Sequence, residues 1–430
     1  MLLLLNLLVK IYRLIMKNFK NILINILLVL FSTAIILFII NVFVILNLKQ
    51  SNKFFNSTVS AYSKNQMSYL QRVFFPDTYS DFNNEYTMIL GDSNTYGNGD
   101  SHLNGDYDYS IAHHLYKEKI NVFNAALPGN DTPRSVLFSL YLYNLIENSF
   151  FVKASQPNKI IFFLYEGNDI HANEQDIYVK NFSQKTCSKF GSNFSIEGDT
   201  GHRLYNPSLR NNSRISLHDL IWESNLYGLK TLYMTLKHQI NLKVQFGNLV
   251  SLLKFILPKN TYQLLEVKYG TPTEIKPEAK NKILLKNNKI KRIGTLQKPP
   301  LNLSEEEINK YFEILETSLQ CLHNKFKTKD KYLIYMPSPS SIYNFEGNEI
   351  YIDAKNMDSI INKKKIESLS NFFEEKTNNI AIKNNFKFHS LKPDLKKIAK
   401  ENILHGDIDR DHFNYLGYKA IADSLIKNIF

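Results

Sequence analysis

Four groups of polar residues, spread along a chain of 430 residues, have the types that an acyl-transfer site needs. A serine hydroxyl attacks a carbonyl carbon when a histidine takes its proton, and that histidine needs an acceptor on its other ring nitrogen. Backbone N–H groups or an amide side chain then bind the oxyanion. The groups that offer these parts are GDS at 91–93, PGN at 128–130, GND at 167–169, and Asp409 with His412.

Each group alone has a simpler interpretation. Ser93 alone could cap a helix, which is a common role for a serine at such a position. Asn168 and Asp169 alone could form a turn after a strand, and His412 alone could be a surface histidine. All four groups occur in order, each after an expected strand or before the last expected helix, and this favours a catalytic site over four coincidences.

The residues between these groups predict strands that alternate with helices. This alternation is typical of a parallel sheet covered by helices, where ligands bind at the carboxyl ends of the strands. The sequence therefore predicts an α/β fold. Apolar runs indicate strands over 86–91, 120–127, 158–169, 331–338 and 386–391, and helical spacing indicates helices over 108–119, 131–148, 304–326, 354–376 and from about Tyr415.

The four groups also resemble the sequence blocks of the SGNH/GDSL hydrolase superfamily. GDSN follows the first expected strand, Gly129 the second and GND the third, and DRDH precedes the last helix. The resemblance covers residues 84–170 and 304–430. It implies the SGNH hydrolase fold, a three-layer α/β/α, flavodoxin-like parallel sheet of about five strands.

By this resemblance, Ser93 is the nucleophile, His412 the base and Asp409 the acid that orients the base. The oxyanion donors are then the backbone N–H groups of Ser93 and Gly129 and the side chain of Asn168. Asp411 is a rival for the orienting acid, and Asp409 is preferred because the family uses a three-residue spacing before the histidine.

Three further residues are expected to support the site. Asp92 and Asn94 flank the serine, and the Asp92 side chain could tie the loop to backbone N–H groups. Asn414, with Gly417, is expected to shape the turn into the last helix. The α/β-hydrolase class shares the order Ser, Asp, His, but its G-x-S-x-G elbow is absent here.

The N-terminal region predicts a membrane anchor. Residues 21–48 contain no charged side chain and exceed the roughly 20 residues that span a bilayer. We expect a cytoplasmic N-terminus at 1–20 (with Met16 as a possible true start), a single transmembrane helix, a stalk at 49–83, and an extracytoplasmic soluble part at a bacterial cell membrane.

Residues 171–303 break the alternation and indicate an insertion or cap subdomain, with a basic, linker-like end. His171, Glu174 and Asp176 lie in it, but the chain has no H-E-x-x-H spacing, so we expect neither a metal nor a cofactor. Cys187 and Cys321 are the only cysteines, and their spacing leaves both a disulfide and two free thiols open.

Composition and net charge indicate which classes of partner the protein is expected to have. With 44% hydrophobic residues the chain is that of a folded protein. The net charge of +12 is spread along the chain rather than gathered in a stripe, which argues against a nucleic-acid partner. Arg134, near the start of an expected helix, could meet an anionic substrate or be an ordinary surface residue.

Three functions follow from the resemblance. The first is a membrane-anchored serine esterase that removes small acyl groups, such as O-acetyl, from a cell-surface glycan. The second uses the same site as an O-acyltransferase that acetylates an envelope polysaccharide together with a polytopic membrane acyltransferase. The third is an inactive binding module, against which the intact set of site residues argues.

Overall fold

The computed structural model describes residues 85–101, 109–126, 132–147, 155–170, 195–197, 203–205, 280–352, 359–407 and 409–430, and several positions between 24 and 36. The chain divides into two units, and the positions between 24 and 36 belong to the first, while all the other described residues belong to the second.

The described positions between 24 and 36 are helical. Among the residues that the structure describes, no helix has both the length and the apolar character needed to cross a bilayer. Most of the predicted span at 21–48 and most of the insertion at 171–303 lie outside the described residues. The whole N-terminal segment 1–20 and the whole stalk at 49–83 also lie outside them.

Five parallel strands form the central sheet. In chain order they are β1 (Thr87–Leu90), β2 (Val122–Asn124), β3 (Lys159–Tyr165), β8 (Asp330–Met336) and β11 (Lys387–Ser390). Their spatial order is β2-β1-β3-β8-β11. This is the 2-1-3-4-5 order of flavodoxin-like sheets, so the predicted α/β fold with a five-stranded parallel sheet is confirmed.

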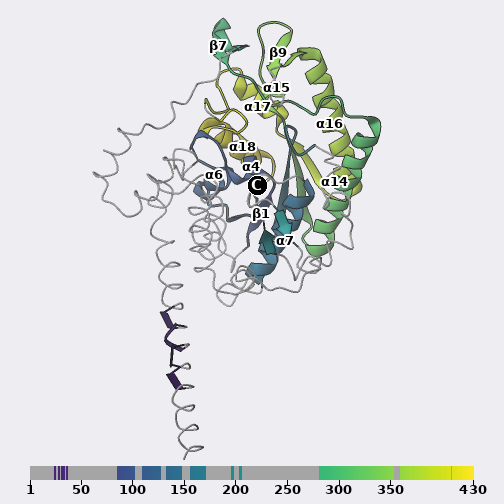
Figure 1. The fold of residues 1–430 in the computed structure, drawn as a ribbon. Coiled ribbons are helices and arrows are strands. Elements are labelled where there is room, and N and C mark those ends of the chain that lie inside the picture. Colours follow the sequence, from purple (N-terminus) through teal and green to yellow (C-terminus); the bar gives the residue numbers. More distant parts are fainter. Residues whose placement is uncertain are drawn as a thin grey trace, which may run out of the picture. The chain divides into compact units, whose positions relative to one another are not determined.

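Helices cover both faces of this sheet (Figure 1). Along β3, Ile160 and Phe162 belong to one core cluster, whereas Ile161 and Phe163 belong to the other. Because successive strand residues point to opposite faces, this alternation requires a helical layer on each side. The first layer is α7 (Thr132–Glu147), α14 (Glu305–Lys325) and α16 (Lys363–Lys383), and the second is α6 (Ile111–Lys117), α17 (Lys392–Ala399) and α18 (Tyr415–Asn428).

Sequence signals set the starts of two of these helices. α14 begins with a capping box, in which Ser304 Oγ accepts from Glu307 N–H and the Glu307 carboxylate accepts from Ser304 N–H. α18 begins at Tyr415, as predicted, because Asn414 caps it by accepting from Gly417 N–H at 3.0 Å.

Two sequence predictions were wrong. The helix expected over 354–376 is α16, which begins only at Lys363 behind its cap Asn362 and follows the strand pair β9 (Glu349–Ile352) and β10 (Ser359–Asn362). The linker-like end of the insertion, within 280–303, forms an antiparallel hairpin of β6 (Asn281–Leu284) and β7 (Ile290–Ile293). Charged residues obscured this hairpin in the sequence because both strands carry lysines on exposed positions.

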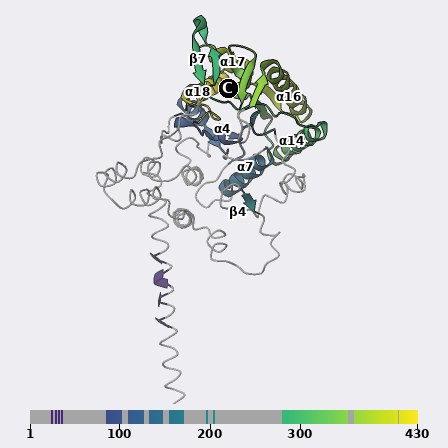
Figure 2. The same cartoon turned by 45° about the horizontal axis from the view of Figure 1, so that its top comes forward.

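The β6–β7 hairpin is attached to the sheet domain by its apolar residues. Ile283 is fully buried and bridges to Phe345, and Leu296, just beyond β7, bridges to Ile352. In both views β7 projects at the upper edge of this unit (Figures 1 and 2). The remaining short elements are α4 (Ser93–Tyr96), η3 (Lys286–Asn288), α15 (Pro339–Ile342), β4 (Ser195–Glu197) and β5 (Arg203–Tyr205).

Cys321 lies on the buried face of α14 and is disulfide-bonded. The other cysteine of the chain, Cys187, lies outside the described residues.

Candidate active site

The candidate site lies where the strand order reverses. The chain passes from β1 to β2 on one side, and then to β3 on the other side of β1. In open α/β sheets, this switch point opens a crevice at the carboxyl ends of the two strands. Ser93 follows β1 and Asn168 follows β3, and the two strands are paired in register from Thr87 with Lys159 to Leu90 with Phe162.

Ser93 is the first residue of the short helix α4, and its neighbour Asp92 is the cap. The Asp92 carboxylate accepts from the backbone N–H groups of Asn94 at 3.0 Å and Thr95 at 3.3 Å. A Cβ at Gly91 would lie 2.2 Å from Thr95 Oγ1, so only glycine lets the strand turn this tightly into the helix. Because Asp92 supplies the cap, the Ser93 hydroxyl is left to pair elsewhere.

A histidine and an aspartate complete a hydrogen-bonded chain from that hydroxyl. His412 Nε2 is 2.8 Å from Ser93 Oγ. His412 Nδ1 is 2.7 Å and 2.8 Å from the two carboxylate oxygens of Asp409. A carboxylate only accepts hydrogen bonds, so Nδ1 carries the proton and Nε2 accepts from the serine, which is the tautomer that general-base catalysis needs.

The charges around His412 stabilise its imidazolium form relative to a free imidazole. Burial lowers the pKa of this imidazole, but the hydrogen bond and charge of Asp409, together with the charges of Asp92 and Asp411, raise the pKa above its usual value. Burial also raises the pKa of the Asp92 carboxyl, against the opposing effects of His412 and of its N–H donors. The carboxylates would thus stabilise the imidazolium that forms if His412 takes a proton from Ser93.

The structure places the two rival acids differently. Asp409 contacts the imidazole, whereas the backbone carbonyl of Asp411 accepts from the Tyr165 hydroxyl at 3.4 Å. Asp411 therefore acts on His412 by its charge, and its carbonyl links the loop before α18, residues 406–412, to the end of β3.

A residue that sequence reasoning missed holds this loop. One carboxylate oxygen of Asp100 accepts from Asp407 N–H and the other from Asp409 N–H, each at 2.7 Å. A Cβ at Gly406 would lie 2.5 Å from Asp100 Oδ1, so the loop backbone passes directly against this carboxylate. No local sequence pattern predicts these hydrogen bonds, because they join residues more than 300 positions apart.

Backbone pairing joins the two ends of the loop at residues 406–412. His405 and Phe413 form an antiparallel bridge, and Gly406 N–H donates to His412 C=O at 3.2 Å. Asn414 Nδ2 donates to the carbonyls of Ile403 and His405 at 2.9 and 3.0 Å. Asn414, expected to support the site, therefore fixes both the neck of the loop and the start of α18.

Of the three expected oxyanion donors, Ser93 N–H and the Asn168 side chain lie in the described residues. Gly129 lies outside the described residues. Asn168 is half-buried beyond β3, and its Oδ1 has no hydrogen-bond partner in the described part of the chain. The turn that carries it is tied by Asp169, whose carboxylate accepts from Tyr165 N–H at 2.8 Å. Asn94, the other expected supporting residue, is buried and its amide lies 3.4 Å from Asp92 Oδ2.

Within the described residues, no group of three or more histidine, cysteine, aspartate or glutamate side chains is arranged to hold a metal ion. His171, Glu174 and Asp176 lie outside those residues. Arg134 is half-buried in the first turn of α7.

Comparison of the chain with protein-family models, curated proteins and solved structures gave no match. The geometry of Ser93, His412 and Asp409, and the fold that positions them, therefore indicate the kind of chemistry that the site can do.

Proposed function

We propose that the protein is an SGNH-type serine esterase, and that it removes small acyl groups, most simply acetyl, from a cell-surface glycan. The observation that carries this proposal is the continuous hydrogen-bonded chain from Ser93 through His412 to Asp409. It stands at the carboxyl edge of a flavodoxin-like sheet, where such folds bind ligands.

In the proposed reaction, Ser93 Oγ attacks the ester carbonyl while its proton passes to His412 Nε2. The carbonyl becomes a tetrahedral oxyanion, which the backbone N–H groups of Ser93 and Gly129 and the Asn168 amide would bind. His412 returns the proton to the leaving sugar hydroxyl, and an acyl-enzyme remains on Ser93. Water, activated by the same imidazole, then attacks the acyl-enzyme and releases the acid and the free serine.

The proposed location is outside the cytoplasmic membrane, with residues 21–48 as a single anchor. The uncharged length of this segment supports the anchor. The disulfide at Cys321 supports an oxidising compartment, where such bonds persist.

The test uses the full-length protein in detergent with p-nitrophenyl acetate, beside Ser93→Ala and the control Ser139→Ala. Ser139 is a buried serine whose hydroxyl donates to the backbone carbonyls of Ser135 and Ala125 rather than to His412. Turnover in water that Ser93→Ala loses and Ser139→Ala keeps supports the esterase. Turnover that requires an added glycan acceptor, with acetylated glycan formed, assigns an acyltransferase instead. Equal inertness of the wild type and Ser93→Ala, with no labelling by a fluorophosphonate, overturns the proposal.

A further inference from the structure

The turn that carries Asn168 is closed on Tyr165, the last residue of β3. Tyr165 N–H donates to the Asp169 carboxylate at 2.8 Å, and Asp169 N–H donates to Tyr165 C=O at 3.1 Å. Because both bonds join the two ends of the turn, the position of Asn168 depends on the position of Tyr165.

The side chain of Tyr165 joins this turn to the loop at residues 406–412. A Cβ at Gly167 would lie 2.5 Å from Tyr165 Cε1 and 2.7 Å from Tyr165 Cζ, so the ring rests against the backbone of the turn. The hydroxyl at the end of the ring donates to Asp411 C=O at 3.4 Å. Asp411 directly precedes His412 in the chain. One side chain therefore spans the distance from the turn of Asn168 to the loop of His412.

The Tyr165 hydroxyl is suited to remain a donor. Tyr165 is fully buried, and burial raises the pKa of its phenol well above the usual value, with further contributions from the charges of Asp411 and Asp92. The phenol therefore keeps its proton near neutral pH, and Asp411 C=O accepts it.

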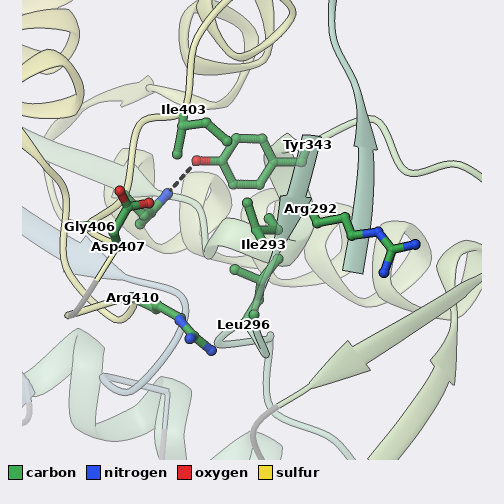
Figure 3. Close-up of a pocket in the computed structure, with 10 residues that line it drawn as sticks. Arg292, Ile293, Leu296, Tyr343, Ile403, Gly406, Asp407 and Arg410 are labelled. Atoms are coloured by element: carbon green, nitrogen blue, oxygen red, sulfur yellow. Dashed lines mark hydrogen bonds between the residues drawn. The ribbon is translucent and has the colours of Figure 1, made fainter. Parts of the chain in front are cut away.

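The loop borders a cavity on the side of the β6–β7 hairpin. Gly406, Asp407 and Arg410 line a cleft of about 260 Å³ (Figure 3). Arg410 reaches across to the chain beyond β7, where a Cβ at Gly294 would lie 1.5 Å from Arg410 Nη1. In the described part of the chain, the loop atoms that face the cleft lack close partners on that side. Hydrogen bonds made elsewhere along the loop therefore contribute more to its position.

Two buried side chains supply such bonds from outside the loop. The Asp100 carboxylate accepts from two N–H groups in its first half. The Tyr165 hydroxyl donates to Asp411 C=O, next to the imidazole. Of these two contacts, the bond from Tyr165 is the nearer to His412 along the chain.

We propose that Tyr165 is a positioning residue, which holds the turn of Asn168 and the imidazole of His412 at a fixed separation. The inference rests on the proposed esterase function. In that reaction the oxyanion donor meets the carbonyl oxygen while the imidazole takes the proton of Ser93, so an error in their separation lowers the rate. Tyr165 acts through the turn and the loop that it contacts, because its own side chain is fully buried.

The kinetic test uses Tyr165→Phe, which removes the hydroxyl and leaves the ring in place. We expect kcat for p-nitrophenyl acetate to fall about threefold to tenfold, as loss of one hydrogen bond does, while KM changes little. Tyr86→Phe is the matched control. Tyr86 is also buried and donates to a backbone carbonyl, that of Ser155 at 2.8 Å, but it precedes β1 at the opposite edge of the sheet. Its loss should leave kcat unchanged, even where the melting temperature falls.

A spectroscopic measurement tests the same link without turnover. In the full-length protein with ¹⁵N-labelled histidine, the signal of His412 Nε2 at a pH where the ring is neutral reports the hydrogen bond from Ser93. His412→Gln identifies the signal, and Ser93→Ala gives its position without that bond. We expect Tyr165→Phe to move the signal toward the Ser93→Ala position and Tyr86→Phe to leave it in place.

Gly167→Ala tests the other end of the link. The added methyl group would press on the Tyr165 ring, so we expect it to move the His412 Nε2 signal as well. In the Tyr165→Phe background the same substitution should cause little further shift, because effects that act through one residue are not additive. An undiminished shift in that background would contradict the link through Tyr165.

Three results overturn the positioning role. They are a wild-type Nε2 signal in Tyr165→Phe, a wild-type kcat in that variant of an active enzyme, and an equal effect in Tyr86→Phe. If the wild type cleaves no ester, the esterase proposal fails, but the Nε2 signal still decides whether Tyr165 positions His412.

Discussion

Ser93 Oγ lies 2.8 Å from His412 Nε2, although 319 positions separate the two residues in the chain. Two separate features of the fold bring the serine hydroxyl and the imidazole together. Asp92 caps α4 and so leaves the serine hydroxyl free of that role, and the loop before α18 brings the imidazole over the end of β1.

The first prediction follows from that contact. Ser93→Ala removes the only hydroxyl that reaches His412 Nε2 in the described residues, so we expect ester turnover to fall on the order of 10³-fold or more. Labelling by a fluorophosphonate, followed on a gel, should disappear with it. The melting temperature should change little, because the Asp92 cap bonds remain. Labelling of Ser93→Ala at the wild-type rate would place the nucleophile elsewhere.

The second prediction concerns pH. His412 must be neutral to take the serine proton, and its pKa is raised above the usual value of 6.5, chiefly by Asp409 against the effect of burial. Activity should therefore fall as the pH drops through an inflection that lies above 6.5. Asp409→Asn removes the main cause that raises the pKa, so we expect the inflection to move to lower pH while kcat falls on the order of 10²- to 10⁴-fold.

The pH profile of kcat/KM for p-nitrophenyl acetate measures both effects. Asp411→Asn is the matched comparison, since the Asp411 carboxylate acts on His412 through its charge and the Asp411 carbonyl remains for Tyr165. We expect a smaller shift in the same direction and a small loss of kcat. If Asp411→Asn lowers kcat more than Asp409→Asn does, Asp411 rather than Asp409 is the acid that orients His412.

The third prediction treats Asp100 as a positioning residue. The Asp100 carboxylate accepts from the N–H groups of Asp407 and Asp409. In Asp100→Asn, an NH₂ group replaces one of the two acceptor oxygens, so two hydrogen-bond donors face each other. A misplacement of the loop by about 1 Å can cost on the order of 10²-fold in rate. We expect kcat to fall by up to that factor and the pH inflection to move down, because the bond from Asp409 to His412 is loosened.

A purely structural role for Asp100 would lower the melting temperature without moving the inflection. Asp423→Asn is the control, because that aspartate pairs with Lys419 on the exposed face of α18. A wild-type pH profile and kcat in Asp100→Asn would contradict the positioning role.

The sheet was predictable because its inner strands β1, β3 and β8 are largely apolar and buried. In β3, six consecutive residues from Ile160 to Tyr165 are buried, and such a run has few alternatives to a strand covered on both faces. The capping box at Ser304 and the cap at Asn414 are equally local signals, and both hold in the structure.

Other features depend on distant contacts that no local pattern encodes. The β6–β7 hairpin reads as basic linker because only a few residues, such as Ile283, turn inward. Asp100 reads as an ordinary loop aspartate, and its role appears only when the segment after His405 folds back over it. The order of the motifs predicts Ser93, Asp409 and His412 as a site, whereas the role of Asp100 is visible only in the folded structure.

The last prediction concerns acid stability and the buried pair of Tyr343 and His405. Burial lowers the pKa of His405 to about 3, so the folded protein leaves it neutral where the unfolded chain, with a pKa near 6.5, binds a proton. The resulting stability is fully present above about pH 6.5 and is lost as the pH falls toward about 3.

His405→Gln removes this titration, so the melting temperature of this variant should fall less steeply between pH 7.5 and pH 5 than that of the wild type. Tyr343→Phe should lower the free energy of unfolding by about 1–3 kcal/mol at both pH values, because Leu404 N–H then lacks its acceptor. Tyr332→Phe should lower it less, because the Tyr332 hydroxyl accepts from the exposed Lys387 at 3.4 Å. A wild-type slope in His405→Gln would show that other groups carry the acid sensitivity.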